Sequence, residues 1–253
     1  MERKPEPESL PVEPFPGAEP SSEPEALPLE ADPLPRVTTG LLVALMLLPW
    51  LWVYLGLIFF ADYRITIIIY EILGCALPTI LLSGSRIPIL PLRCNGPRLF
   101  AVSFILAILI LLVYFGSDNF GMNWEVFHRR AKLTHLVVSG GFWLFAGIIA
   151  MVNPILEESF WRGLVYRAWR HRLGPLKARW ITSFFFGAWH WMVLREFCHP
   201  VWAVVLTLLV MIGGFTFCML FERSRTLGPS ILFHCIGADL PMIFVVYDCV
   251  TNH

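Results

Sequence analysis

The stretch GLLVALMLLPWLWVYLGLIFFA at residues 40–61 decides the fold, because it carries no charged side chain over its whole length. A helix needs about 20 such residues to cross the hydrocarbon core of a bilayer. Backbone groups at that depth must bond to one another, so a spanning run predicts a helix. Six further apolar runs follow, at 65–83, 99–116, 135–155, 180–194, 200–221 and 228–249.

These runs predict an all-α fold, a polytopic membrane helical bundle of seven to eight transmembrane helices. The eighth would be a separate helix at 156–172, beginning after Asn153-Pro154, since proline is well placed in the first turn of a new helix. Composition agrees, with 57% hydrophobic and 15% charged residues, where a soluble domain carries about 25% charged residues. The formal net charge is zero, so no basic surface favours nucleic acid.

Residues 1–38 form a Pro/Glu-rich segment without a periodic apolar face, and we interpret them as a disordered tail. The tail has no basic region followed by an apolar one, so it is not a signal peptide. Residues 39–253 would be the bundle. The six cysteines show neither CxxC pairing nor metal-ligand spacing, and we interpret them as small hydrophobic residues.

Loop charges predict the orientation of the bundle. With seven long spans, ten arginines and lysines fall on one side and five on the other. The positive-inside rule then places the richer side and the N-terminus in the cytoplasm. We expect an integral protein of a bacterial inner (plasma) membrane. The richer side carries Arg86, Arg93, Arg98, Arg167, Arg170, Arg172, Lys177, Arg179, Arg223 and Arg225.

Two adjacent acids, Glu157 and Glu158, follow the fourth apolar run directly. Ionisable residues at membrane depth are costly and are candidates for function. Glu158 and Arg162 are four residues apart, on one helix face, and can form an ion pair. Glu157 lies about 100° away around the helix and can face another environment. The alternative is an interfacial helix start, where acids favour the positive end of the helix dipole.

Two histidines also lie inside apolar runs. His190, framed by aromatic residues, could bond a backbone carbonyl in the core or act as a general base. His234 shares its run with Asp239, but five residues correspond to about 140° of rotation on a straight helix, so the two would not face one partner. Glu71, alone in the second run, is interpreted as a structural hydrogen-bonding residue. An acid and two histidines on three helices should converge inside the bundle, away from lipid.

Three short motifs occur in a fixed order along the chain. They are EExxxR at 157–162, FxxxH at 186–190 and the later intramembrane His234. This order resembles the CAAX-protease and bacteriocin-processing family, also called the Abi family of intramembrane glutamic endopeptidases. The resemblance covers roughly residues 40–250 and leaves out the acidic tail.

The resemblance implies a cavity open toward the cytosolic leaflet and hydrolysis of a peptide bond by an activated water, without a covalent intermediate. Glu157 would be the general base, and His190 would orient the water or carry its proton. His234, with Asp239, would donate to the oxyanion of the tetrahedral intermediate. The expected partners are a peptide or membrane-protein substrate and the lipid bilayer; no nucleic acid, cofactor or metal is expected.

The remaining matched residues would have supporting roles. Glu158 and Arg162 would form the supporting pair, and Phe186 would shape the cavity beside His190. A glutamate shielded from bulk water suits the general-base role, because its basicity is then increased.

The chain departs from the family at the last motif, usually HxxxN or HxxxD. Ala238 occupies that position and cannot donate, and Asp239 is one residue late. Pro241 leaves the carbonyl of Gly237 without its usual helical partner, so a bulge could rotate Asp239 inward.

Three alternatives remain open on the sequence. Glu157, His190 and His234 could bind zinc in a metalloprotease, although no HExxH helix is present. The bundle could be a catalytically inactive scaffold or a bacteriocin-immunity-type protein, which Ala238 favours. A transporter is the third, but no pair of broken spans marks a midplane site. The sequence does not specify the substrate, the role of the tail or the oligomeric state.

Overall fold

The computed structural model describes residues 37–83, 96–133 and 141–252. The predicted disordered tail lies outside the described residues, apart from its last two positions. Loop residues Arg86 and Arg93 and the first part of the predicted 135–155 run also lie outside them. In the described ranges the regular structure is helical, apart from one isolated antiparallel bridge between Met122 and Cys198. The all-α prediction is confirmed.

The first part of the bundle contains a helical hairpin and a third long helix. Several helices include a π-helical segment, marked η. The segments are α1 (Thr39–Val53), η1 (Tyr54–Phe59), α2 (Tyr63–Ile68), η2 (Ile69–Ala76), α3 (Leu77–Ser83) and α4 (Gly96–Gly116).

Two short helices then lead into the second part, which carries the three motifs. The segments are α5 (Asp118–Gly121), α6 (Trp124–Leu133), α7 (Gly141–Gly147), η3 (Ile148–Val152), α8 (Asn153–Glu158), η4 (Ser159–Tyr166), α9 (Arg167–Leu173), α10 (Pro175–Phe197), α11 (Pro200–Ser224), α12 (Gly228–His234), η5 (Cys235–Asp239) and α13 (Leu240–Asn252).

Six helical units in the described ranges are long and apolar enough to cross a membrane: Thr39–Phe59, Tyr63–Ser83, Gly96–Gly116, Gly141–Leu173, Pro200–Ser224 and Gly228–Thr251. The predicted run at 180–194 lies within α10, which is equally long but carries more charge. The bundle presents many large apolar side chains on its outside, including Phe104 and Ile105 of α4. Such a surface suits lipid, and the chain is an integral membrane protein.

The predicted separate helix at 156–172 is wrong, because the fourth span continues without a break from Gly141 to Leu173. A proline inside a helix removes one backbone bond and crowds the carbonyl one turn earlier. Here Pro154 follows η3, where the amide of Asn153 bonds the carbonyl of Ile148, five residues back. This wider turn accommodates the proline, so the helix does not have to end.

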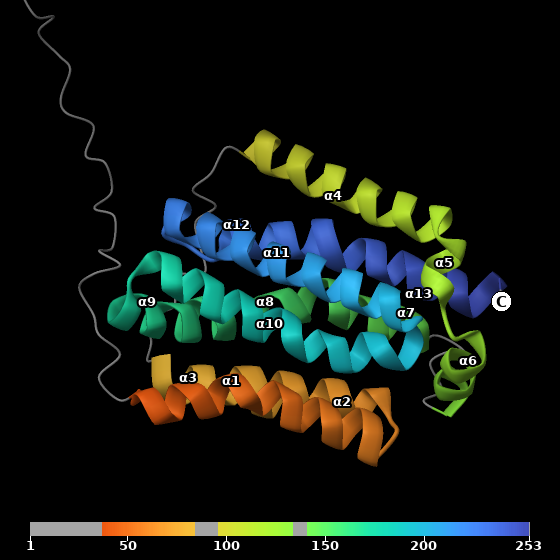
Figure 1. The fold of residues 1–253 in the computed structure, drawn as a ribbon, viewed down its shortest axis with the longest axis horizontal. Coiled ribbons are helices and arrows are strands. Elements are labelled where there is room, and N and C mark those ends of the chain that lie inside the picture. The colour runs from red at the N-terminus through yellow and green to blue at the C-terminus, as the bar shows by residue number, and fades with distance from the viewer. Residues whose placement is uncertain (1–36, 84–95, 134–140, 253) are drawn as a thin grey trace, which may run out of the picture.

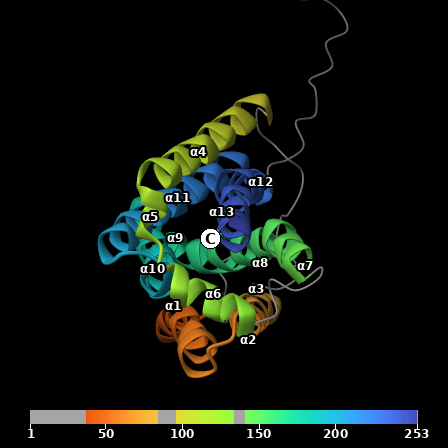
Figure 2. The same cartoon turned by 90° about the vertical axis from the view of Figure 1, so that its right-hand side faces the viewer.

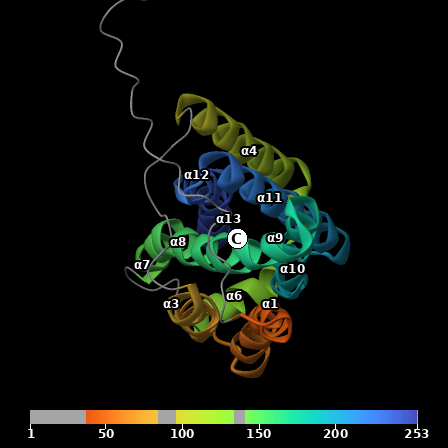
Figure 3. The same ribbon diagram turned by 90° about the vertical axis from the view of Figure 1, so that its left-hand side faces the viewer.

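The long helices run side by side along the molecule (Figure 1). Seen end-on, α1, α2 and α3 form one layer, α8, α9 and α10 a middle layer, and α11, α12 and α13 the next, with α4 outermost (Figures 2 and 3). The crossing of α10 and α11 is very close. A Cβ atom on Gly187 would lie 3.0 Å from the backbone nitrogen of Met211, so only glycine fits there.

Basic side chains gather at one end of the bundle, as the loop charges predict. Arg170 and Arg179 both pair with Glu222 near the end of α11. Arg172 donates to the carbonyl of Val37, just before α1 begins. The start of the first span therefore lies at the same end as these basic residues.

Candidate active site

Glu157 and Glu158 end α8 in the middle of the long fourth span, and both are buried, with 1% and 0% of their surface exposed. The continuous helix explains this depth. It places the two acids near the middle of the span and inside the bundle and not at the start of a helix, so the alternative of an interfacial helix start does not hold.

Glu158 forms the predicted ion pair with Arg162. The distance between Arg162 Nη1 and Glu158 Oε1 is 2.7 Å, and both side chains are fully buried. Arg162 Nη2 donates to the carbonyl of Gly214 on α11, at 3.1 Å. The guanidinium also lies between two rings, 4.4 Å from the centre of Phe186 and 4.6 Å from that of Phe217. A Cβ atom at Gly214 would lie 3.0 Å from Phe186 Cδ1 and 3.3 Å from Arg162 Nη2, so a side chain there would crowd both groups.

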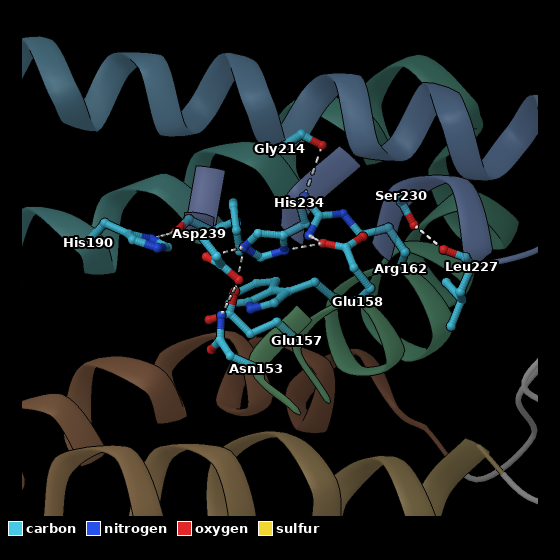
Figure 4. Close-up of polar contacts among 12 residues, drawn as sticks. Asn153, Glu157, Glu158, Arg162, His190, Gly214, Leu227, Ser230, His234 and Asp239 are labelled. Carbon is cyan, nitrogen blue, oxygen red and sulfur yellow. Dashed lines mark hydrogen bonds and ion pairs between the residues drawn. The ribbon is translucent and has the colours of Figure 1, made fainter. Parts of the chain in front are cut away.

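His234, at the end of α12, is the centre of the cluster (Figure 4). Its Nδ1 lies 3.1 Å from Glu158 Oε1. Its Nε2 lies 3.6 Å from Glu157 Oε2 and 3.6 Å from Asp239 Oδ1. The imidazole stacks on Phe217, with ring centres 4.9 Å apart and planes 21° apart, so its orientation is fixed on both edges and one face.

Asp239 reaches His234 because the backbone between them is π-helical. In a π turn the bond runs from a residue to the one five positions on, so residues five apart come to lie on the same side. Residues Cys235–Asp239 form such a turn, η5, and Asp239 is 8% exposed. The bulge that the sequence suggested near Pro241 is therefore present. Asn153 Nδ2 donates to Asp239 Oδ2 at 3.3 Å.

His190 lies on α10, at the left of the view in Figure 4. Its Nδ1 bonds the carbonyl of Phe186 at 2.7 Å, which leaves Nε2 for another partner. Its ring lies 3.7 Å from that of Trp189 and 4.9 Å from that of Phe186. No direct contact joins His190 to Glu157 among the described residues, so a shared water molecule between them stays a prediction.

Four residues around the cluster are absent from the sequence-based set: Tyr70, Asn153, Trp161 and Phe217. Asn153 could have been found, because it is a polar residue in an apolar run four positions before Glu157 and so shares its face. The three aromatic residues gave no signal, since aromatic residues are common in membrane spans. Their contacts depend on how the helices pack.

Glu71 is buried, at 4% exposed, on η2. Its Oε2 has no hydrogen-bond partner among the described residues, and the side chain lies within electrostatic reach of Glu157 and Asp239. The predicted structural hydrogen bond is not seen at that oxygen. Glu71 instead adds a further acid to the neighbourhood of Glu157.

The described residues offer no group of three or more His, Cys, Asp or Glu side chains arranged to hold a metal ion. The zinc alternative, which would use Glu157, His190 and His234, therefore finds no ready-made ligand set. The acids of the cluster instead contact His234, Arg162 and neutral donors.

Comparison with known proteins shows which sequences the segment around this cluster resembles. Residues 139–237 match the sequence model described as type II CAAX prenyl endopeptidase Rce1-like. The predicted resemblance is confirmed. The matched segment includes both acids, Arg162, His190 and His234, and it stops before Asp239. A CAAX-protease likeness therefore covers the residues that form the centre of the cluster.

One curated protein is also similar. The UPF0177 protein YaiH of Lactococcus lactis subsp. lactis (strain IL1403) is 31% identical over 104 residues, which is 41% of this chain. The match spans only 39% of the length of that protein. No solved structure matches the chain.

The geometry allows a specific assignment of hydrogens at His234. A carboxylate only accepts, so Nδ1 must donate to Glu158. Nε2 then carries a hydrogen only in the imidazolium form, whose counter-ions would be Glu157 and Asp239, each 3.6 Å away. In that form His234 presents a charged donor next to an acid with one unpartnered oxygen, Glu157 Oε2. The pair can activate a water and stabilise a developing negative charge.

Proposed function

We propose that this chain is a membrane-embedded endopeptidase of the CAAX-protease type, which hydrolyses a peptide bond with a water activated by Glu157 and His190. One observation carries the proposal. Within the segment that matches the family, His234 Nε2 lies 3.6 Å from Oε2 of a buried glutamate that has no hydrogen-bond partner at that oxygen among the described residues.

In this proposal Glu157 Oε2 accepts a proton from the water that attacks the substrate carbonyl. His190 holds the same water through Nε2, because Nδ1 is bonded to Phe186. The oxygen of the tetrahedral intermediate then takes its hydrogen bond from His234 Nε2. The proton held by Glu157 passes to the leaving amine, which completes hydrolysis without a bond between enzyme and substrate.

Asp239 has a second role in this proposal, as the counterpart of the residue that the family usually places at 238. Protonated, it donates to the same oxyanion; ionised, it orients His234. Glu158, Arg162 and Phe186 support the site, since they fix the Nδ1 side of His234 and the aromatic wall beside His190.

The substrate would be a peptide or membrane protein that reaches the bundle from the bilayer. The basic end of the bundle supports a cytoplasmic N-terminus, and we place the protein in a bacterial plasma membrane with its cavity toward that side. The family description includes prenyl substrates, so prenylated and plain peptides must be tested side by side.

The test uses the full chain in proteoliposomes with two quenched fluorescent probes: a farnesylated peptide ending in a CAAX sequence, and the same peptide without the lipid. Glu157→Gln removes the base and keeps the shape of the side chain. We expect cleavage to fall by about 10²–10⁴-fold. Glu222→Gln is the matched control, because Glu222 contacts Arg170 and Arg179 away from the cluster, and it should keep its activity.

Retained cleavage in Glu157→Gln would overturn the proposed mechanism. A wild-type chain that cleaves neither probe, but binds them with an affinity unchanged by Glu157→Gln, would favour the inactive scaffold, which Ala238 supports as the second candidate.

A further inference from the structure

We propose that Tyr70 is a positioning residue of this site. It fixes the carboxylate of Glu157 through its hydroxyl group, and its ring packs against the aromatic residue that contacts His190. The proposal rests on the proposed function and adds to it a residue from the second span, outside the segment that matches the family.

The first contact selects the reactive oxygen of Glu157. The hydroxyl of Tyr70 donates to Oε1 of Glu157, and both side chains are buried. Oε2, by contrast, has no hydrogen-bond partner among the described residues and faces His234 Nε2. A terminal carboxylate torsion is broad and nearly two-fold, so without an anchor either oxygen could take either place. Tyr70 keeps Oε2 on the side of His234.

The direction of this hydrogen bond follows from a third residue. Trp161 Nε1 lies 3.4 Å from the hydroxyl oxygen of Tyr70. An indole nitrogen can only donate and a carboxylate can only accept, so the tyrosine oxygen accepts from Trp161 and its single hydrogen goes to Glu157. The donation is therefore directed and does not depend on a rotating hydroxyl. Trp161 lies on the same helix as Glu157, so this helix and the second span hold one another at the site.

The ring of Tyr70 connects the acid with His190. It packs against Trp189 with ring centres 4.6 Å apart, and Trp189 packs on His190 at 3.7 Å. One tyrosine therefore contacts the proposed base through its hydroxyl and the neighbour of the proposed second catalytic group through its ring. A shift of Tyr70 would move both groups relative to a shared water.

The local backbone leaves room for this ring. Tyr70 belongs to the π-helical segment η2, and Gly74 follows it on the same segment. A Cβ atom on Gly74 would lie 3.3 Å from Tyr70 Cδ2 and 3.0 Å from Trp52 Cδ1, tighter than ordinary contact. A side chain at 74 would press Tyr70 out of place, so the glycine admits the tyrosine between the second span and Glu157.

The experiment replaces Tyr70 with phenylalanine, which removes the hydroxyl and keeps the ring on Trp189. We expect kcat to fall roughly 10- to 100-fold, as a small misplacement of a catalytic group does, with KM unchanged because Tyr70 is buried and does not reach the substrate. Tyr166→Phe is the matched control. Tyr166 is equally buried and also donates to a glutamate, Glu222, but away from the site.

A second readout does not require activity. The infrared carboxyl band that disappears in Glu157→Gln should move in Tyr70→Phe and stay in place in Tyr166→Phe. An unmoved band, or an unchanged kcat in Tyr70→Phe where Glu157→Gln is inactive, would overturn the role of Tyr70 and leave the peptidase proposal intact. Full activity in Glu157→Gln would instead remove the peptidase proposal, while the band shift would still decide whether Tyr70 holds Glu157.

Discussion

The bundle contains two clusters of acids and arginines. Acids outnumber arginines in the cluster inside the bundle, and arginines outnumber acids in the cluster at its end. Inside the bundle, Glu157, Glu158 and Asp239 surround His234, and Arg162 is the one permanent cation in contact with them among the described residues. At the end of the bundle a single acid, Glu222, takes two arginines and a tyrosine hydroxyl.

The buried side-chain atoms without a hydrogen bond among the described residues differ in part between the two clusters. In the interior they are Oε2 of Glu157 and of Glu158 and Nε of Arg162, whereas at the end they are guanidinium nitrogens alone, Nε of Arg170 and of Arg179. Burying an acid without enough cations is costly, and such an excess is typical of a site that handles protons. In the end cluster the single acid is paired with two arginines, and these contacts join α9, α10 and α11.

The largest expected effect comes from breaking the interior ion pair. Arg162→Met removes the cation while Glu158 stays buried, so we expect a loss of about 3–5 kcal/mol in the free energy of unfolding. Arg179→Met at the end cluster should lose about 1 kcal/mol or less, because its side chain is 24% exposed and Glu222 keeps Arg170. Denaturant unfolding in detergent measures both. Equal losses in the free energy of unfolding would mean that the greater burial of the Arg162 ion pair does not make it more important for stability.

A smaller effect is expected from replacing Asp239, one of the three acids around His234. Asp239→Ala should lower cleavage about 10²–10³-fold, as does the loss of one oxyanion donor. Asp239→Asn should remain within about ten-fold of wild type, because an amide always has a donor. Neither change should destabilise the fold, since each removes a charge from a region where three acids surround one histidine. A fall in Asp239→Asn as large as in Asp239→Ala would contradict the donor role.

The smallest effect extends the comparison to a partly exposed acid outside the spans. Asp62, between the first two spans, caps α2 and pairs with Arg64 at 2.9 Å. The hydrogen bond from the Arg64 side chain lowers the pKa of this carboxyl below its ordinary 3.8. Its stabilisation is therefore complete at neutral pH and is lost as the pH falls below about 4.

Asp62→Asn should lower the melting temperature by about 1–2 °C at pH 7, and the difference should shrink as the pH falls below about 4 and the carboxyl group is protonated. High salt should shrink it as well, because exposed charges are screened. A difference that stays constant as the pH falls below about 4 would show that the charge of Asp62 does not account for it.

Much of the fold could be predicted because hydropathy is a local property. The run at 40–61 contains the described span Thr39–Phe59 almost residue for residue, and the spacing of Glu158 and Arg162 was enough for their ion pair. The boundary at Pro154 was wrong, because proline usually starts or breaks a helix and the π turn that absorbs it leaves no local signal.

The members of the candidate site could be predicted only in part. The charged residues and histidines were found, since few such residues occur in membrane spans. Tyr70 and Phe217 were missed because nothing in their own segments sets them apart from residues that face lipid. Asp239 was placed correctly only by assuming a π turn, which the pattern of apolar residues does not require.

The order of the residues by itself determined a bundle of membrane helices and the three motifs within it, because burial in lipid and helical spacing depend on near neighbours alone. The packed structure decided which oxygen of Glu157 has no hydrogen bond among the described residues and which nitrogen of His234 faces that oxygen. It also decided that Asp239 lies next to the same nitrogen. Those facts depend on the rotation of each helix about its axis, and rotation is set by contacts between segments that are far apart in the chain.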